Sequence, residues 1–83
     1  MGLDVVELLM NIEAQYGFEI SDAEARQMRS VGDLHAYILA HASPRPDPDA
    51  AWSWLRDMIE QEFGIERERI TPDAWVVRDL GIN

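Results

Sequence analysis

The fold is decided by residues 3–38, LDVVELLMNIEAQYGFEISDAEARQMRSVGDLHAYI, in which three helical patterns follow one another. In residues 3–16, apolar side chains recur at the 3.6-residue spacing of one helix face. These side chains are Val5, Leu8, Leu9, Ile12 and Tyr16. Gly17 follows directly and is typical of a helix stop. The spacing therefore predicts a helix over residues 3–16 with one buried face.

Two shorter helices are indicated after it. Ser21 and Glu24 have the spacing of a capping box, which predicts a brief helix ending near Arg29. Ser30 can cap a third helix that ends around His41, because another set of apolar residues shares a face there. That set is Val31, Leu34, Tyr37 and Ile38.

A proline-rich segment separates the two halves of the chain. Residues 43–49, SPRPDPD, hold three alternating prolines, and we expect no helix there because proline removes a backbone donor and restricts its predecessor. Such a linker spans roughly 20 Å at about 3.1 Å per residue. Residues 50–63 regain helical periodicity, and Gly64 supplies the stop.

The last segment is expected to be irregular. Residues 65–70 are predicted to be a charged loop. Thr71 and Pro72 have the arrangement of an N-cap and a first-turn proline, which predicts a short turn of helix through Trp75 and Val76.

Composition narrows the function classes. The 83 residues carry a net charge of -9 and are 47% hydrophobic, which is typical of one small folded domain. All seven basic residues are arginine, and the first 24 residues hold six carboxylates and no cation. Because this field repels phosphates and anionic lipids, nucleic acid and membrane surfaces are poor partners, and a basic protein surface is the natural complement.

Catalytic and metal chemistry are not indicated. The chain has no cysteine, and His35 and His41 have no visible third ligand, so no metal site is expected. No phosphate-binding glycine loop and no nucleophile with a base in motif spacing is present, so we expect no enzyme and no catalytic residue. Neither a signal peptide nor a membrane span is visible, which favours a cytoplasmic location. Three tryptophans favour packing over a ligand site, with a small-ligand binder as the alternative.

Residues 3–38 resemble the second to fourth helices of acyl carrier proteins. The resemblance is carried by Leu3, Asp4, Val6, Glu7, Leu8, Met10, Ile12, Glu13, Tyr16, Val31, Tyr37 and Ile38. Residues 54–83, WLRDMIEQEFGIERERITPDAWVVRDLGIN, resemble the part that comes first in that family, namely its first helix and a loop ending in D-L-G-x-(D/N). The halves therefore stand in swapped order.

The resemblance implies an all-α fold: a four-helix acyl-carrier-like bundle that is circularly permuted or completed by a domain swap. Residues 1–83 would form a single domain, with helices two to four in residues 1–42, a linker at 43–49, and helix one with its loop in residues 50–83. Both a closed monomer and a domain-swapped homodimer remain open, because a linker of this length permits either.

The family's cofactor is 4'-phosphopantetheine, carried on a serine that directly precedes the leucine matched by Leu3. Here the attachment position falls at Gly2, between Asn83 and Leu3. Glycine has no hydroxyl, so the resemblance implies a carrier that binds no cofactor at this position and cannot be loaded there.

In the family, the helix matched by residues 3–16 docks on basic patches of fatty-acid and polyketide biosynthetic enzymes. The matching candidate docking residues are Asp4, Val6, Glu7, Met10 and Glu13. A solvated acidic face would explain the carboxylates, but exposed Val6 and Met10 among them favour a partner site. The alternative function is a structural interaction module that binds a basic partner through the same helix.

Overall fold

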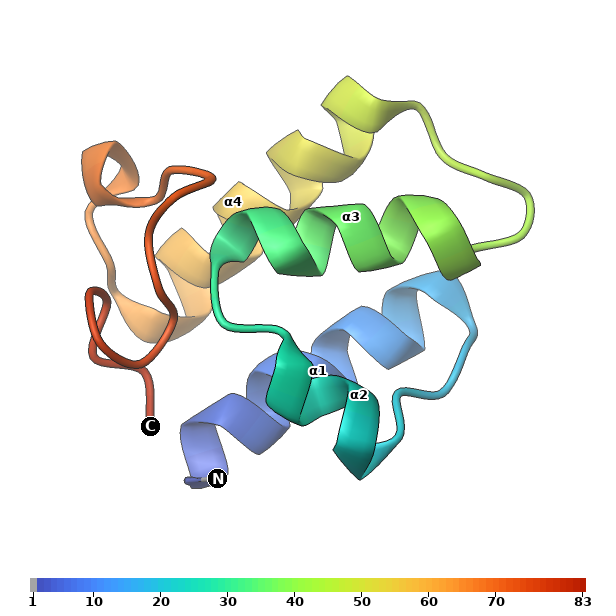
Figure 1. Ribbon diagram of the computed structural model, residues 1–83. Helices are drawn as coiled ribbons and strands as arrows, with labels where there is room; N and C mark the ends of the chain where they lie inside the picture. The colour runs from blue at the N-terminus through green and yellow to red at the C-terminus, as the bar shows by residue number, and fades with distance from the viewer. Residues whose placement is uncertain (1) are drawn as a thin grey trace.

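The computed structural model describes residues 2–83, which form four α-helices and one short 3-10 helix around a shared core (Figure 1). The elements are α1 (Leu3–Tyr16), α2 (Asp22–Gln27), α3 (Val31–His41), α4 (Pro48–Phe63) and η1 (Arg67–Arg69). Across residues 2–83 there is no β-strand, and one isolated antiparallel bridge joins Ser30 to Trp75. The all-helical prediction is therefore confirmed, and no helix in this range is long and apolar enough to cross a membrane.

Local signals set the helix ends in the first half. α1 ends at Gly17, whose φ of 73° is left-handed, as predicted. The hydroxyl of Ser21 caps α2 and the hydroxyl of Ser30 caps α3, each within a capping box. α2 ends at Gln27, before the predicted Arg29, because the N–H of Arg29 donates to the Asp33 carboxylate at 2.9 Å instead of continuing the helix.

α4 begins earlier than the linker prediction allowed. Residues 43–49 were expected to be free of helix, but Pro48 occupies the first turn of α4. The reason is that a proline at this position loses no intrahelical hydrogen bond. The side chain of Asp47 caps the helix by accepting from the N–H of Ala50 at 3.0 Å. The helix ends at Gly64 as predicted, with φ of 65°.

The predicted turn of helix through Trp75 and Val76 is wrong. Residues 71–80 form turns instead, because their backbone groups bond to the start of α3. The carbonyls of Pro72 and Ala74 each accept a hydrogen bond at 2.9 Å, from the N–H groups of Gly32 and Val31 respectively, and the N–H of Val76 donates to Arg29. A short 3-10 helix, η1, does form nearby, within residues 65–70. This range was expected to be a loop.

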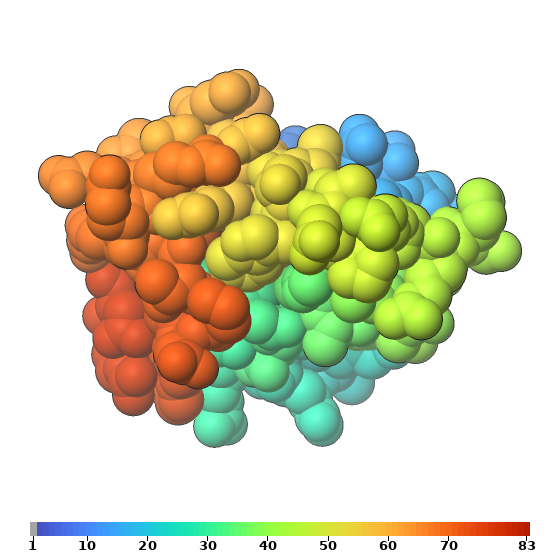
Figure 2. All heavy atoms as spheres, turned by 90° about the horizontal axis from the view of Figure 1, so that it is seen from above, coloured from blue at the N-terminus to red at the C-terminus, as the bar shows by residue number. Residues whose placement is uncertain are grey.

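Both halves of the chain build one core. α4 packs against α3, and the segment after α4 closes one end of the bundle (Figures 1 and 2). The largest fully buried side chains come from both halves: Leu8, Ile12, Val31, Ile38, Leu55, Ile59, Ile70 and Ile82. Within residues 2–83 no polar or charged residue is buried, so apolar burial supplies the driving force. The single chain therefore completes its own core.

Candidate functional site

The two ends of the described chain meet beside the start of α1 (Figure 1). The carbonyl of Asn83 accepts a hydrogen bond from the N–H of Val5 at 3.1 Å, and the carbonyl of Gly2 accepts one from Val6 at 3.2 Å. The second bond has the i to i+4 spacing of an α-helix. The first would have the same spacing if Asn83 directly preceded Gly2. Asn83 thus occupies the place of a residue before Gly2 in the helical register.

Gly2 is held against Asn83. A Cβ atom added to Gly2 would fall against the carbonyl carbon of Asn83, 2.6 Å from its oxygen and 3.2 Å from its Cα. Any side chain at position 2 therefore requires Asn83 to shift.

The predicted attachment position does not fit 4'-phosphopantetheine. That group needs a hydroxyl, and Gly2 has none. The hydroxyls of Ser21 and Ser30 are engaged in helix caps. Ser43 lies in the linker, and Ser53 lies on the exposed side of α4. None of these serines neighbours Asn83 in the chain.

The outer face of α1 combines carboxylates with exposed apolar side chains. Asp4 and Glu7 are exposed, and among residues 2–83 neither lies within 4.0 Å of a basic nitrogen. Val6 and Met10 are exposed beside them, at 40% and 59%. Leu3, which was not among the predicted docking residues, is the most exposed large apolar side chain of residues 2–83, at 87%. The sequence signal that could have identified Leu3 is its i, i+3, i+7 spacing with Val6 and Met10, which puts the three on one helix face.

Glu13 has a different role from the residues of this outer face. It is half-buried, and its Oε2 accepts a hydrogen bond from the N–H of Ile20 at 2.7 Å. This bond fixes the loop between α1 and α2. The structure therefore keeps Asp4, Val6, Glu7 and Met10 together on the surface, while Glu13 serves the loop.

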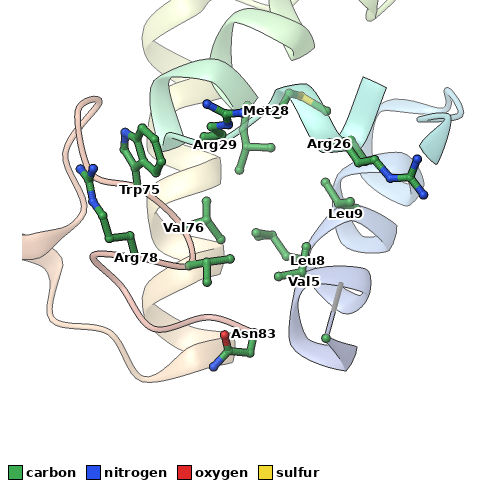
Figure 3. Close-up of a pocket in the computed structure, with 14 residues that line it drawn as sticks. Val5, Leu8, Leu9, Arg26, Met28, Arg29, Trp75, Val76, Arg78 and Asn83 are labelled. Atoms are coloured by element: carbon green, nitrogen blue, oxygen red, sulfur yellow. The ribbon is translucent and has the colours of Figure 1, made fainter. Parts of the chain in front are cut away.

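A largely apolar cavity of about 550 Å³ lies between α1, the end of α2 and the C-terminal loop (Figure 3). It is lined by Gly2, Val5, Leu8, Leu9, Ala25, Arg26, Met28, Arg29, Leu34, Trp75, Val76, Val77, Arg78 and Asn83. The meeting point of the chain ends is thus part of its wall. The sequence does not indicate this cavity, because its residues come from distant segments and share no motif.

Trp75 stands at the edge of the cavity between two arginines. The guanidinium carbon of Arg78 lies 4.0 Å from the indole centroid and that of Arg29 lies 5.6 Å from it. The backbone N–H of Trp75 donates to Asp79 at 2.8 Å, and Asp79 also pairs with Arg78 at 3.1 Å. These bonds hold the pKa of Asp79 below its usual value, first through Arg78 and then through the Trp75 N–H.

The other singled-out residues have structural surroundings. Trp54 packs edge-on against Tyr16, and Trp52 packs against His35, as the packing interpretation predicted. His41 stacks on Tyr37 with ring centroids 4.0 Å apart. Over residues 2–83, no group of three or more His, Asp or Glu side chains is placed to hold a metal ion.

Arg67 of η1 forms two ion pairs with α4 that the sequence did not suggest. Arg67 pairs with Asp57 at 2.6 Å and with Glu60 at 3.3 Å. All three side chains are substantially exposed, so the pair adds little stability. Arg56 donates to the carbonyl of Arg67, which ties η1 to α4.

Fold and site together define a small all-helical bundle with an acidic, partly apolar helix beside an apolar cavity. No family model and no solved structure matches the chain. Curated proteins do match: the acyl carrier protein of Chlamydia trachomatis (serovar L2) is 49% identical over 39 residues, or 47% of this chain and 51% of that protein. The acyl carrier protein of Chlamydia caviae is 50% identical over 36 residues, or 43% of this chain and 47% of that protein. The chain therefore spans about half the length of the curated relatives it matches, and these matches support a relationship with the acyl carrier protein family.

Proposed function

We propose that this chain is an acyl carrier protein-like module, not an enzyme, that docks on basic surfaces of fatty-acid or polyketide biosynthetic enzymes and carries no phosphopantetheine at Gly2. The observation that supports docking is the outer face of α1. Asp4 and Glu7, two carboxylates with no basic nitrogen of residues 2–83 within 4.0 Å, flank the exposed apolar residues Leu3, Val6 and Met10. A face of this composition complements a basic patch with an apolar centre.

The order of the helices is part of the proposal. α4 and the loop after it stand for the family's first helix and loop, and α1, α2 and α3 stand for helices two to four. Two observations support this circular permutation. Leu55 and Ile59 of α4 complete the core under the first three helices, and Asn83 bonds to Val5 in the helical register that a preceding residue would have.

The proposal that the chain carries no phosphopantetheine at this position rests on Gly2. The residue that would carry the prosthetic group has no hydroxyl, and its Cβ position is occupied by the backbone of Asn83. A module that docks without a loaded group would occupy the carrier site of its partner enzyme. Its effect would then be competitive or architectural, rather than delivery of an acyl chain.

The docking proposal is tested by binding to a panel of carrier-dependent ketosynthases, acyltransferases and ketoreductases, measured by surface plasmon resonance at low and high salt. Glu7→Lys should weaken binding about tenfold, which is about 1.4 kcal/mol, mainly by slowing association. Raising the salt should weaken the native complex, because exposed charges are screened.

Glu62→Lys is the matched control, since Glu62 is exposed on α4 and undergoes the same change of charge. It should leave binding unchanged. Equal weakening by both variants would reduce the effect to net charge and contradict a docking face on α1. Binding to no enzyme of the panel, together with binding of an unrelated basic protein through Glu7, would support the interaction module instead.

A further inference from the structure

The surface around Trp75 is basic, in contrast to the acidic outer face of α1. We call it the arginine face, and it consists of Arg26, Arg29, Arg78, Trp75 and the exposed Val77. We infer that the arginine face binds the outer face of α1 on a second copy of this chain, so that copies associate head to tail. This contact needs no partner enzyme, and it covers the same face of α1 that is proposed to dock.

Trp75 organises the arginine face. The guanidinium carbons of Arg78 and Arg29 lie 4.0 Å and 5.6 Å from the centroid of its indole ring, and Figure 3 shows both side chains beside the ring. Arg26 and Arg29 also line, together with Trp75, an open and largely polar hollow of about 810 Å³ between α2 and the start of α3. Tryptophan and arginine are the residue types that most often anchor protein interfaces.

Two of the three arginines keep a charge that the described chain does not pair. No carboxylate oxygen of residues 2–83 lies within 4.0 Å of the side-chain nitrogens of Arg26 or Arg29. Asp33 also lines the hollow, but its carboxylate already accepts hydrogen bonds from two backbone N–H groups. Arg78, in contrast, pairs with Asp79. Arg26 and Arg29 are therefore available to carboxylates from another molecule.

The outer face of α1 supplies what the arginine face lacks. Its carboxylates, Asp4 and Glu7, have no basic nitrogen of residues 2–83 within 4.0 Å, and a guanidinium binds a carboxylate through two parallel hydrogen bonds. Each face also has an exposed apolar side chain beside its charges, Met10 at 59% on α1 and Val77 at 53% on the arginine face. Since every copy carries both faces, a second copy is a partner of matching charge.

The two faces cannot both pair with the same neighbour. Val5 and Leu9 line the cavity wall that faces the arginine face, and Glu7 lies about 160° from each of them around the helix axis. The outer face of α1 therefore points away from the arginine face of its own chain. A contact between two different faces is heterologous and can repeat from copy to copy.

The net charge of -9 limits the strength of this association. Copies repel one another at long range, but about 0.15 M salt screens charges beyond about 8 Å and leaves the direct carboxylate–guanidinium contacts. At about 1 M salt the screening length falls to about 3 Å, so the exposed pairs weaken as well. We therefore expect weak association at physiological salt that is lost at high salt.

The test is sedimentation velocity of the chain alone, from about 10 μM to about 1 mM, a range suited to weak complexes. At about 0.15 M salt the average mass should rise with concentration above that of one chain, and at about 1 M salt it should fall back. Arg29→Gln and Glu7→Gln should each weaken association about tenfold. Arg45→Gln and Glu62→Gln are the matched controls, because they make the same charge changes at exposed positions in the linker and on α4. They should leave association unchanged.

Mixing the two interface variants tests the head-to-tail arrangement. Arg29→Gln keeps an intact outer face of α1, and Glu7→Gln keeps an intact arginine face, so the mixture contains one native pair of faces. It should associate more strongly than either variant alone and stop at two chains. The inference is overturned by a native chain that stays monomeric throughout, by equal weakening in a control, or by a mixture no stronger than its components. None of these results bears on docking, because no enzyme is present.

Discussion

The backbone carbonyl of Asn83 accepts a hydrogen bond from the N–H of Val5 at 3.1 Å, although the two residues lie at opposite ends of the chain. The first N–H groups of a helix have no partner within that helix, and α1 receives no side-chain cap from Gly2. The end of the C-terminal loop thus supplies a partner that the side chain of the N-cap residue, Gly2, cannot supply. This contact predicts that the chain can be cut and rejoined without loss of the fold.

A rejoined chain tests that prediction. Residues 47–83 followed directly by residues 2–42 would link Asn83 to Gly2 and open the linker instead. We expect the same bundle, because the Asn83–Val5 bond already has the register of a continuous helix. The measurement is an NMR amide spectrum combined with urea unfolding. A spectrum without the native dispersion, or a loss of cooperativity, would argue against the permuted arrangement.

Shortening Ile82 should measurably weaken the bundle. Ile82 is 2% exposed and lies in the core beside Leu80. Ile82→Val should lower the free energy of unfolding by about 1 kcal/mol, because it removes one buried methylene group. The control is Val77→Ala, since Val77 is 53% exposed and should change the free energy of unfolding far less. Equal effects would mean that the C-terminal loop is not part of the core.

A second prediction on stability concerns the N-cap of α3. The Ser30 hydroxyl accepts from the N–H of Asp33 at 3.0 Å, and the same turn anchors the loop through the Ser30–Trp75 bridge. Ser30→Ala should cost about 1 kcal/mol in the free energy of unfolding. Ser53→Ala, at an exposed position inside α4, should be close to neutral. Thermal and urea unfolding of both variants provide the comparison.

Acid should remove part of this cap. The pKa of Asp33 is held below its ordinary value of 3.8, first by the backbone hydrogen bond from Ser30 and then by that from Arg29. A lowered pKa in the folded state means that the ionised carboxylate stabilises the fold above pH 3.8, and that this stabilisation disappears as the pH falls through the lowered value.

The measurable consequence is a pH-dependent gap between two proteins. Asp33→Asn should be less stable than the native chain at neutral pH, and the difference in the free energy of unfolding should shrink below about pH 4. Urea unfolding at several pH values gives this difference directly. A gap that stayed constant down to the lowest pH would mean that ionisation of Asp33 does not contribute.

The parts of the fold that could be predicted from sequence are those with local causes. The bounds of α1 and the cap of α3 follow from periodicity, from Gly17 and from Ser30. The turn of helix predicted at Trp75 and Val76 does not form, because the backbone groups of this segment bond to the start of α3. No local sequence pattern indicates that partner. The same loop approaches α3 so closely that a Cβ on Gly32 would meet the carbonyl oxygen of Pro72 at 2.8 Å.

Some features of the candidate site could likewise be predicted from local sequence, and others could not. The exposure of Val6 and Met10 could be predicted because both fall off the core stripe of a regular helix. The hydrogen bond from Ile20 to Glu13 and the grouping of Arg29 with Trp75 could not, since each joins residues that only the fold brings together. Long-range contacts decided these features, whereas helical spacing decided the others.

The most direct test of the account is the intact mass of the rejoined chain carrying Gly2→Ser, after incubation with coenzyme A and a promiscuous phosphopantetheinyl transferase. The unaltered chain is measured beside it, and an ordinary carrier protein serves as the positive control. A permuted carrier without its serine predicts that the rejoined serine variant gains one phosphopantetheine and that the unaltered chain gains none. An unmodified serine variant beside a modified control, or modification of the unaltered chain, would contradict it.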